Sequence, residues 1–227
     1  MSGDGRLKIK NALVSVSDKT GLEKLVTSLD ENKVSIFSTG GTAEFIESLG
    51  LNVTKVSEIT NFPEIMDGRV KTLNPLIYGG ILNRIGIDDD IQKEYGMINL
   101  DLMVINLYPF EETISGNNVD EADAIENIDI GGPSMIRAAA KNFYNKAVLT
   151  DPEDYEWFIE ILNDDNCSVS EGTRRALALK AFRKTAMYDS AIHNYFSPKN
   201  DIGQWVYDPE YPSIEMPDEI PLGLKKI

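Results

Sequence analysis

The feature that most constrains the fold is an alternation of short apolar runs and amphipathic stretches near the N-terminus. Residues 12–17 and 34–38 are typical of buried strands, and each is followed by a stretch with helical spacing, 22–30 and 42–49. Residues 51–56 form a further short extended segment. This β-α-β-α-β order predicts a parallel sheet with helices on both faces, an α/β fold of Rossmann type with three layers.

The remainder of the chain continues this pattern and then departs from it. Further strands are predicted at 102–107 and 147–150, and a helix begins near Pro133 and ends near Lys141. Beyond residue 150 the pattern is helical only, and from residue 197 it is rich in proline without any period. We therefore expect three segments: a nucleotide-binding α/β core at 1–150, a helical appendage at 151–196, and a linker or extended arm at 197–227.

Two predicted strands are each followed by a turn that suits an anion. Ser17 and Lys19 stand in the turn after the first strand, and Gly40 and Gly41 stand after the second. Because parallel strands direct their carboxyl ends to one edge of the sheet, the two turns should be neighbours there. Free N–H groups at the following helix starts favour a phosphate. A capped helix and a tight turn without ligand are the alternative reading.

Charged residues stand near three other predicted element ends. Arg69 and Lys71 follow a glycine, and a turn with two cations suits a doubly charged anion. Asp129 precedes a Gly-Gly pair, with Lys141 at the end of the next short helix. A carboxylate and an amine brought together would change each other's pKa. Taken singly, each of these residues is more often a solvated surface charge, so the pattern alone leaves both readings open.

Composition limits the class of partner and of cofactor. The formal net charge of −15 disfavours general binding to nucleic acid or to anionic membranes. A single cysteine, Cys167, excludes an intrachain disulfide, and with one histidine, His193, a metal site is not expected. No apolar run approaches the length of a membrane span, and the N-terminus lacks the pattern of a signal peptide. We expect a cytoplasmic protein that acts on a small phosphorylated substrate.

Several long segments, taken together and in order, identify a family. The chain resembles the inosine monophosphate (IMP) cyclohydrolase domain, the N-terminal half of the bifunctional purine biosynthesis protein, from about residue 13 to residue 196. The matching segments are SVSDKTG at 15–21, STGGTA at 38–43, VSEITNFPE at 56–64, GRVKTL at 68–73, NLYPF at 106–110, IDIGG at 128–132, RAAAKN at 137–142 and LALKAF at 177–182. The resemblance implies the fold of methylglyoxal synthase.

The resemblance also implies which residues serve the reaction. Positions assigned to catalysis in the family are matched by Lys71, Tyr108, Asp129 and Lys141. Positions that bind the nucleotide are matched by Ser17, Asp18, Lys19, Thr20, Thr39, Gly40, Gly41, Thr42, Arg69, Val70, Thr72, Ile105, Asn106, Ile130 and Gly131. The implied reaction closes the purine ring of 5-formamidoimidazole-4-carboxamide ribonucleotide (FAICAR) with loss of water, which yields IMP. It has no redox step and calls for no cofactor or metal.

Two departures from the family pattern concern the site and the length. Asn74 and Tyr78 stand where the family usually has histidines, so an imidazole role at those positions is absent. The chain ends near where the family's folate-dependent transformylase half would begin. The resemblance implies a homodimer. A ligand-sensing regulatory domain of the same fold remains the alternative function, and methylglyoxal synthase is disfavoured because its chemistry calls on an active-site histidine. The two readings differ in whether FAICAR is turned over.

Overall fold

The computed structural model of this chain describes residues 5–63, 65–66, 69–108, 110–115 and 120–197. Its contacts divide the chain into two compact units, Met1–Tyr108 with Asp129–Thr185, and Pro109–Ile128 with Ala186–Ile227. The first unit contains every residue assigned above to a site. Of the predicted linker or arm at 197–227, residues 198–227 lie outside the described residues, and the boundaries predicted at residues 150 and 196 stay a prediction.

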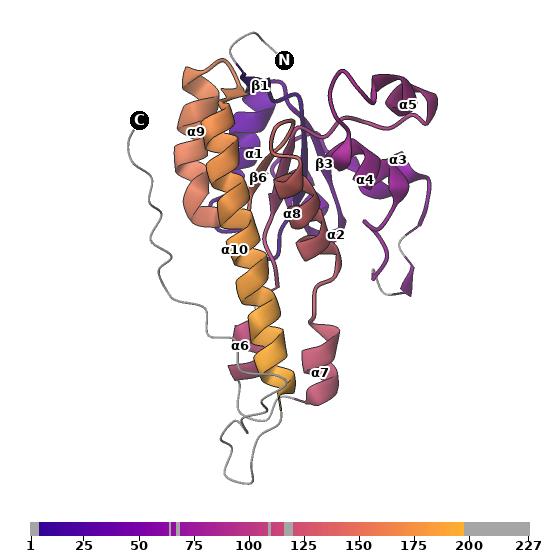
Figure 1. Ribbon diagram of the computed structural model, residues 1–227, viewed down its shortest axis with the longest axis vertical. Helices are drawn as coiled ribbons and strands as arrows, with labels where there is room; N and C mark the ends of the chain where they lie inside the picture. Colours follow the sequence, from indigo (N-terminus) through magenta and orange to yellow (C-terminus); the bar gives the residue numbers. More distant parts are fainter. Residues whose placement is uncertain (1–4, 64, 67–68, 109, 116–119, 198–227) are drawn as a thin grey trace. The chain divides into compact units, whose positions relative to one another are not determined.

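A parallel sheet of five strands forms the centre of the first unit, as the sequence predicts (Figure 1). Its order is β4-β3-β2-β5-β6. The strands are β2 (Asn11–Ser15), β3 (Ser35–Ser38), β4 (Thr54–Lys55), β5 (Leu102–Ile105) and β6 (Ala147–Leu149). The chain proceeds outward from β2 to β4 and then resumes at β5 on the other side of β2. The strand order therefore changes direction between β2 and β5, which is where open α/β sheets bind ligands.

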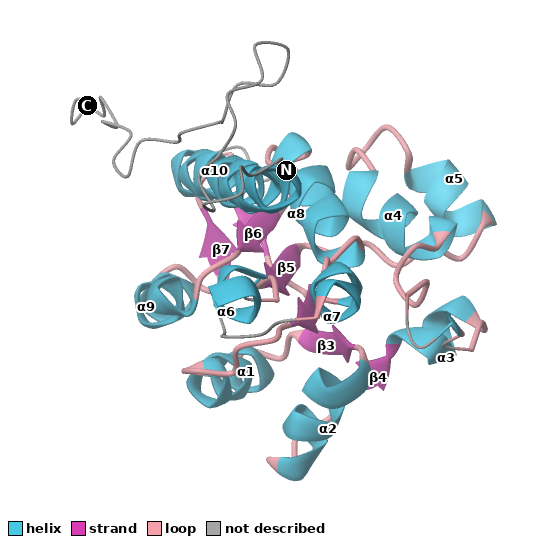
Figure 2. Cartoon of the chain, turned by 90° about the horizontal axis from the view of Figure 1, so that it is seen from below, coloured by secondary structure: helices cyan, strands magenta, loops and turns pink. Residues whose placement is uncertain are grey.

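Helices cover both faces of the sheet, so the middle residues of β2 and all residues of β5 are apolar and buried. In Figure 2, α1 (Leu22–Glu31), α2 (Gly40–Ser48) and α9 (Tyr155–Asp164) lie on one side, while α4 (Pro75–Leu82) and α8 (Gly131–Lys141) lie on the other. The apolar stripe of α1 recurs at helical spacing and is fully buried among the core residues. The three-layer α/β fold predicted from the sequence is confirmed.

Several smaller elements complete the two units. A two-residue ribbon pairs β1 (Leu7–Lys8) with β7 (Ser168–Val169) in antiparallel fashion. The helical pattern predicted beyond residue 150 begins as a 3-10 turn, η2 (Pro152–Asp154), and continues as α9. The other helices are α3 (Val56–Thr60), α5 (Asp89–Glu94), α6 (Phe110–Ser115), α7 (Glu121–Glu126) and α10 (Glu171–Phe196), with η2 at Pro152–Asp154. Within the described part of the chain, every helix is too short or too polar to span a bilayer.

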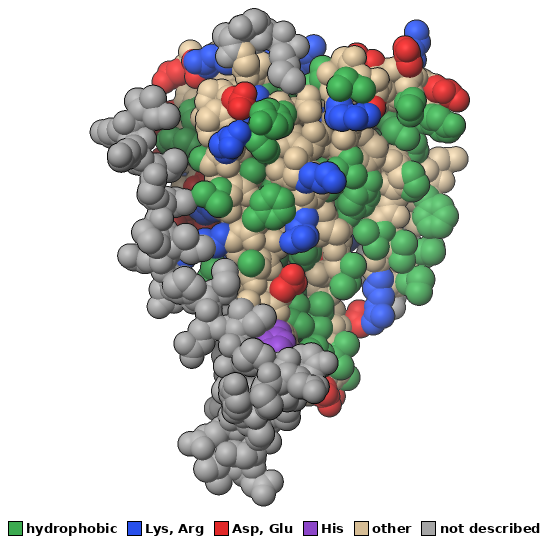
Figure 3. Space-filling model, viewed as in Figure 1, with side chains coloured by type: hydrophobic (Ala, Val, Ile, Leu, Met, Phe, Trp, Pro, Cys, Tyr) green, Lys and Arg blue, Asp and Glu red, His purple; other side chains and the backbone are tan. Residues whose placement is uncertain are grey.

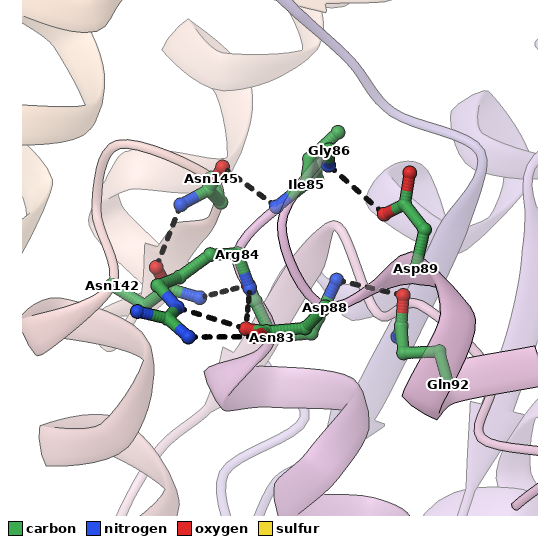
Figure 4. A network of polar contacts seen from close by, with 9 residues as sticks. All are labelled: Asn83, Arg84, Ile85, Gly86, Asp88, Asp89, Gln92, Asn142 and Asn145. Atoms are coloured by element: carbon green, nitrogen blue, oxygen red, sulfur yellow. Dashed lines mark hydrogen bonds and ion pairs between the residues drawn. The ribbon is translucent and has the colours of Figure 1, made fainter.

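Asparagine side chains anchor the connection between α4 and α5 (Figure 4). The Asn142 amide donates to the carbonyls of Ile81 and Asn83, at 2.8 and 2.7 Å, and accepts a bond from Asn145 at 2.8 Å. The helix α5 that this anchor supports has no buried residue. Hydrophobic side chains gather on the face over α4 and α5 in Figure 3. This anchored segment lies at the edge of the sheet where the strands begin.

A buried lysine extends this network into the core. Lys146, at the start of β6, is only 1% exposed, and its Nζ donates to the side-chain oxygens of Asn83 and Asn99, each at 2.6 Å. Burial lowers the pKa of Lys146 to about 7, while the nearby Asp101 carboxylate favours the charged form. Asp101 accepts from the backbone N–H groups of residues 10 and 11, both at 2.9 Å. The amine is therefore held partly uncharged by its surroundings.

This lysine predicts a dependence of stability on pH. Because its pKa is lower in the folded protein, the unfolded chain binds more protons between pH 7 and about 10, so the Lys146 contribution to stability rises with pH there. The contribution should grow by up to about 1.4 kcal/mol per pH unit. Comparing the free energy of unfolding of the unaltered protein with that of Lys146→Met isolates this contribution. A difference that stays constant from pH 7 to 9 would contradict the shifted pKa.

Candidate functional site

The turns after β2 and β3 are joined to each other at the carboxyl edge of the sheet, as the sequence predicts. Ser15 Oγ and Thr39 Oγ1 lie 3.1 Å apart. Thr42 Oγ1 accepts from the Val16 N–H at 3.1 Å and donates to the Val16 carbonyl at 3.0 Å. Thr39 and Thr42 are buried, so these contacts form in a protected environment. The two threonines thus fix the relative position of the two turns rather than projecting toward solvent.

The start of α2 exposes backbone at this edge. Gly40 has φ of +44°, a conformation that L side chains rarely adopt, so glycine suits this position. A Cβ built on the next residue, Gly41, would have no atom within 4 Å, so the described chain leaves open space beside it. The Thr42 and Ala43 N–H groups bond the Thr39 carbonyl, at 3.2 and 3.3 Å, so the N–H groups of Gly40 and Gly41, which precede them, are the ones that a helix start offers to a ligand. The start of α2 therefore has the geometry of an anion site.

Lys71 connects this turn to the start of α8. Its Nζ lies 3.5 Å from the position of a Cβ on Gly40, and its charge favours ionisation of the Asp129 carboxyl group. Thr72 Oγ1 lies 2.8 Å from the position of a Cβ on Gly131. Residues that are 31 to 91 positions apart in sequence are therefore brought to one place, with a cation beside a carboxylate.

Asp129 is held by the backbone at the beginning of α8. Its Oδ1 accepts from the Gly132 N–H at 2.8 Å. Burial raises the pKa of Asp129, while the N–H groups of Gly132 and Gly131 and the Lys71 cation oppose this effect. A Cβ on Gly132 would lie 2.3 Å from Asp129 Oδ2, so the second glycine of this pair allows the carboxylate to approach the helix start. The result is a half-buried carboxylate whose proton affinity is higher than that of an ordinary aspartate.

Asn106 shapes the loop after β2 with its own side chain. Its Oδ1 accepts from the N–H groups of Ser17 and Asp18 at 2.6 and 3.1 Å, and its Nδ2 donates to the Asp18 carbonyl at 2.7 Å. This side chain, at the end of β5, bridges the position where the strand order changes direction. Tyr155 of α9 also hydrogen-bonds Asn106 and is buried beside the loop. The Asn106 amide is therefore largely committed to the protein itself.

Asp18 and Thr20 are partners of each other in the same loop. Asp18 Oδ1 accepts from the Thr20 N–H at 2.8 Å and from its hydroxyl at 2.7 Å, and these bonds lower the pKa of Asp18. This arrangement is an Asx turn, which a loop adopts without a ligand. Ser17 and Lys19, both half-buried, lie on the same loop. Of the residues in this loop that are predicted to bind the nucleotide, Ser17 and Lys19 have side chains whose geometry is compatible with that role.

The other predicted site residues lie in varied environments. Ile105 is buried at the end of β5 and contributes no exposed side chain. Tyr108 and Ile130 are exposed, at 53% and 62%. Arg69 is also exposed and Val70 is half-buried, on the segment that carries Lys71.

Lys141 is a predicted catalytic residue that the structure places away from this cluster. It is exposed in the last turn of α8, ten residues after Gly131. At 1.5 Å per residue the two ends of this helix are about 15 Å apart. The start of α8 stands at the carboxyl edge of the sheet and its end at the opposite edge. An extended lysine side chain of the same chain does not cover that distance.

Sequence reasoning left two structural contributors to this site unassigned. Ser134, in the first turn of α8, contacts the Tyr78 hydroxyl and donates to the Gly131 carbonyl at 2.9 Å. Tyr155 carries no motif and is typical of a core aromatic residue, so no local signal identifies it. Of the two departures noted above, Asn74 caps α4 by accepting from the Leu76 N–H at 2.9 Å.

Two other features bear on alternative sites. Among the described residues no group of three or more His, Cys, Asp and Glu side chains could hold a metal ion. A groove between α1 and α9 is lined by four glutamates and by one lysine, Lys24. Its lining residues are Glu23, Lys24, Thr27, Ser28, Glu31, Glu156, Ile159, Glu160 and Asn163. An anionic ligand would be repelled there, so the cluster at the carboxyl edge is the better candidate.

Comparisons with known proteins identify relatives of this chain. Residues 139–219 match the AICARFT/IMPCHase bienzyme family. Over 200 residues the chain is 50% identical to the bifunctional purine biosynthesis protein PurH of Xanthomonas oryzae pv. oryzae and to that of Xanthomonas campestris pv. campestris. Each alignment covers 88% of this chain and 38% of the relative. The chain therefore spans well under half the length of these curated relatives.

A solved structure and a second family model cover the fold itself. The crystal structure of ForH superposes with a TM-score of 0.74 at 34% sequence identity, over 83% of this chain and 100% of ForH. Residues 21–134, which include both glycine turns and Lys71, match the model of the MGS-like domain. The family expected from the sequence is confirmed, and the chain belongs to the family of MGS-like domains.

Proposed function

We propose that this chain is an IMP cyclohydrolase, which closes the second ring of FAICAR with loss of water. The observation that carries the proposal is that Lys71 and Asp129 lie together beside the exposed start of α2. They lie at the carboxyl edge of the sheet, whose strand order changes direction between β2 and β5. The family match and the 50% identity to proteins named for purine biosynthesis support it. A nucleotide substrate needs both an anion site and proton chemistry, and this edge offers both.

The substrate phosphate is assigned to the loops after β2 and β3. The first N–H groups of α2, with Ser17 and Lys19 opposite, provide donors and one positive charge. Thr39 and Thr42 hold the two loops at a fixed separation through their contacts with Ser15 and Val16. Because the phosphate is bound away from the reacting atoms, its binding orients the imidazole ring for closure.

Ring closure joins the carboxamide nitrogen of FAICAR to its formyl carbon. The nitrogen is a poor nucleophile because its lone pair is delocalised into the amide, so it must lose a proton as the new bond forms. Asp129, whose pKa is raised by burial, suits removal of this proton. Lys71 and Tyr108 suit the oxyanion that develops on the formyl oxygen. This oxygen takes up two protons and its bond to carbon breaks, so that it leaves as water, while the formamido nitrogen gives up its proton and forms the C=N double bond of the new ring. No electron transfer takes place, so the reaction calls for no redox cofactor.

The proposed role of Lys141 requires a second copy of the chain. Its position in the last turn of α8 places it about 15 Å from the start of that helix. We assign the donation of a proton to the departing oxygen to the partner's Lys141 in a homodimer. The remaining length of the curated relatives is assigned to the transformylase half. A cytoplasmic location belongs to the same proposal.

The direct test is turnover of FAICAR by the purified chain, followed by the change in ultraviolet absorbance on ring closure. Asp129→Asn should lower kcat by roughly 10²–10⁴-fold with little change in KM, because a base acts only in the transition state. Asp164→Asn, an exposed aspartate at the end of α9, is the matched control and should leave both constants unchanged. Nucleotide binding without any turnover would contradict the proposal and favour a ligand-sensing domain.

The assignment of Lys141 is tested by mixing two inactive variants. Asp129→Asn and Lys141→Ala should each be nearly inactive alone. After subunits are exchanged at equal concentration, half of the dimers are hybrids with one intact site each, so activity should recover to about a quarter of that of the unaltered protein. Two results would contradict the assignment. Either Lys141→Ala retains its kcat, or both variants are inactive and hybrids that form recover nothing.

A further inference from the structure

Tyr78 connects α4 with the first turn of α8. It lies in the middle of α4, and its half-buried hydroxyl contacts Ser134 Oγ. Asn74, four residues earlier, caps the same helix, so the backbone that carries Tyr78 is anchored at its start. None of the roles proposed above uses this tyrosine. Its contact is with the turn that holds Asp129, however, and not with the apolar core.

The hydrogen-bond direction between these two residues follows from their chemistry. Ser134 Oγ donates to the Gly131 carbonyl at 2.9 Å. A serine hydroxyl carries a single hydrogen, so this bond uses it. In the contact with Tyr78, Ser134 must therefore accept, and the Tyr78 phenol must donate. Burial raises the pKa of Tyr78, the hydrogen bond with Ser134 opposes this effect, and Asp129 adds a smaller upward contribution; the net effect is upward, so the phenol keeps its proton through the neutral range.

The chain of bonds continues through one peptide group to the carboxylate. The Gly131 carbonyl and the Gly132 N–H belong to the same peptide unit, and the Gly132 N–H donates to Asp129 Oδ1 at 2.8 Å. Donation to a carbonyl polarises its peptide and strengthens the N–H as a donor. Tyr78, Ser134, the Gly131–Gly132 peptide and Asp129 thus form one continuous series in which every donor points the same way.

We propose that Tyr78 is a positioning residue for the carboxylate of Asp129, acting through Ser134 and the peptide between Gly131 and Gly132. The proposal rests on the proposed function for its catalytic meaning, since Asp129 is there the base. Tyr78 touches neither the assigned base nor a reacting atom. It fixes the first turn of α8 and strengthens the bond that the carboxylate accepts, which keeps Asp129 ionised and oriented.

The charged and titratable groups that face Asp129 come from two other elements. Lys71, on the segment before α4, acts on the carboxyl group by its charge. Tyr78 faces it from α4. Both Gly131 and Gly132 contribute N–H groups from α8. Removing the Tyr78 phenol therefore changes one identified contribution to the pKa of Asp129, while those of Lys71 and of the two backbone donors remain.

The test follows the Asp129 carboxyl carbon by NMR as pH is varied, in protein with ¹³C-labelled aspartate, the signal being assigned with Asp129→Asn. Tyr78→Phe should move the Asp129 titration upward by roughly half a pH unit, because loss of cooperativity weakens a bond by about 10–30%. Ser134→Ala should do the same, and the double variant should add little. Tyr95→Phe, at an exposed tyrosine of the α5 segment, is the control and should not move it.

The kinetic readout has a matching expectation. The acid limb of kcat should move with the titration, so that kcat at low pH falls about threefold in Tyr78→Phe while KM is unchanged. An unchanged Asp129 titration in Tyr78→Phe, with only a lower melting temperature, would overturn the proposal and leave Tyr78 as a packing residue. A shifted titration in a protein that never turns over FAICAR would uphold this inference and reject the proposed function.

Discussion

The site depends on one constraint, the parallel direction of all five strands. Because β2, β3 and β5 end at the same edge, the loops that follow them meet there, although they are up to 90 residues apart in sequence. Asn106 converts this proximity into a fixed geometry, since its amide holds the backbone of Ser17 and Asp18 across the position where the strand order changes direction. The candidate anion site and the Lys71–Asp129 pair both form because chain segments meet at this edge of the sheet.

Much of this arrangement could be predicted because its signals are local. The apolar period of 22–30 and the apolar runs at 12–17 and 102–107 are set by burial, so they appear in the sequence as they do in the structure. The glycine turn at Gly40 is also readable, since positive φ favours glycine. The antiparallel ribbon of β1 and β7 was missed because two-residue strands carry no period.

Interactions between distant residues could not be predicted in the same way. The resemblance implies nucleotide binding by Asn106, which stays a prediction; that its amide also holds the neighbouring loop depends on where β2 ends and could not be read from the sequence. Lys141 and Asp129 are separated by the length of α8, and the family resemblance alone does not predict this separation. The sequence identified Asn74 and Tyr78 only as positions where the family usually has histidines. In the structure Asn74 caps the start of α4, and Tyr78 contacts Ser134 at the start of α8.

We infer that the carboxyl edge of the sheet is a single nucleotide site, and a crystal structure with bound IMP is the decisive experiment. The phosphate should lie at the start of α2 beside Lys19, and the purine ring beside Lys71 and Asp129. Density for the nucleotide elsewhere, such as the groove between α1 and α9, would contradict the claim. So would an empty edge in crystals soaked at a concentration that saturates binding in solution.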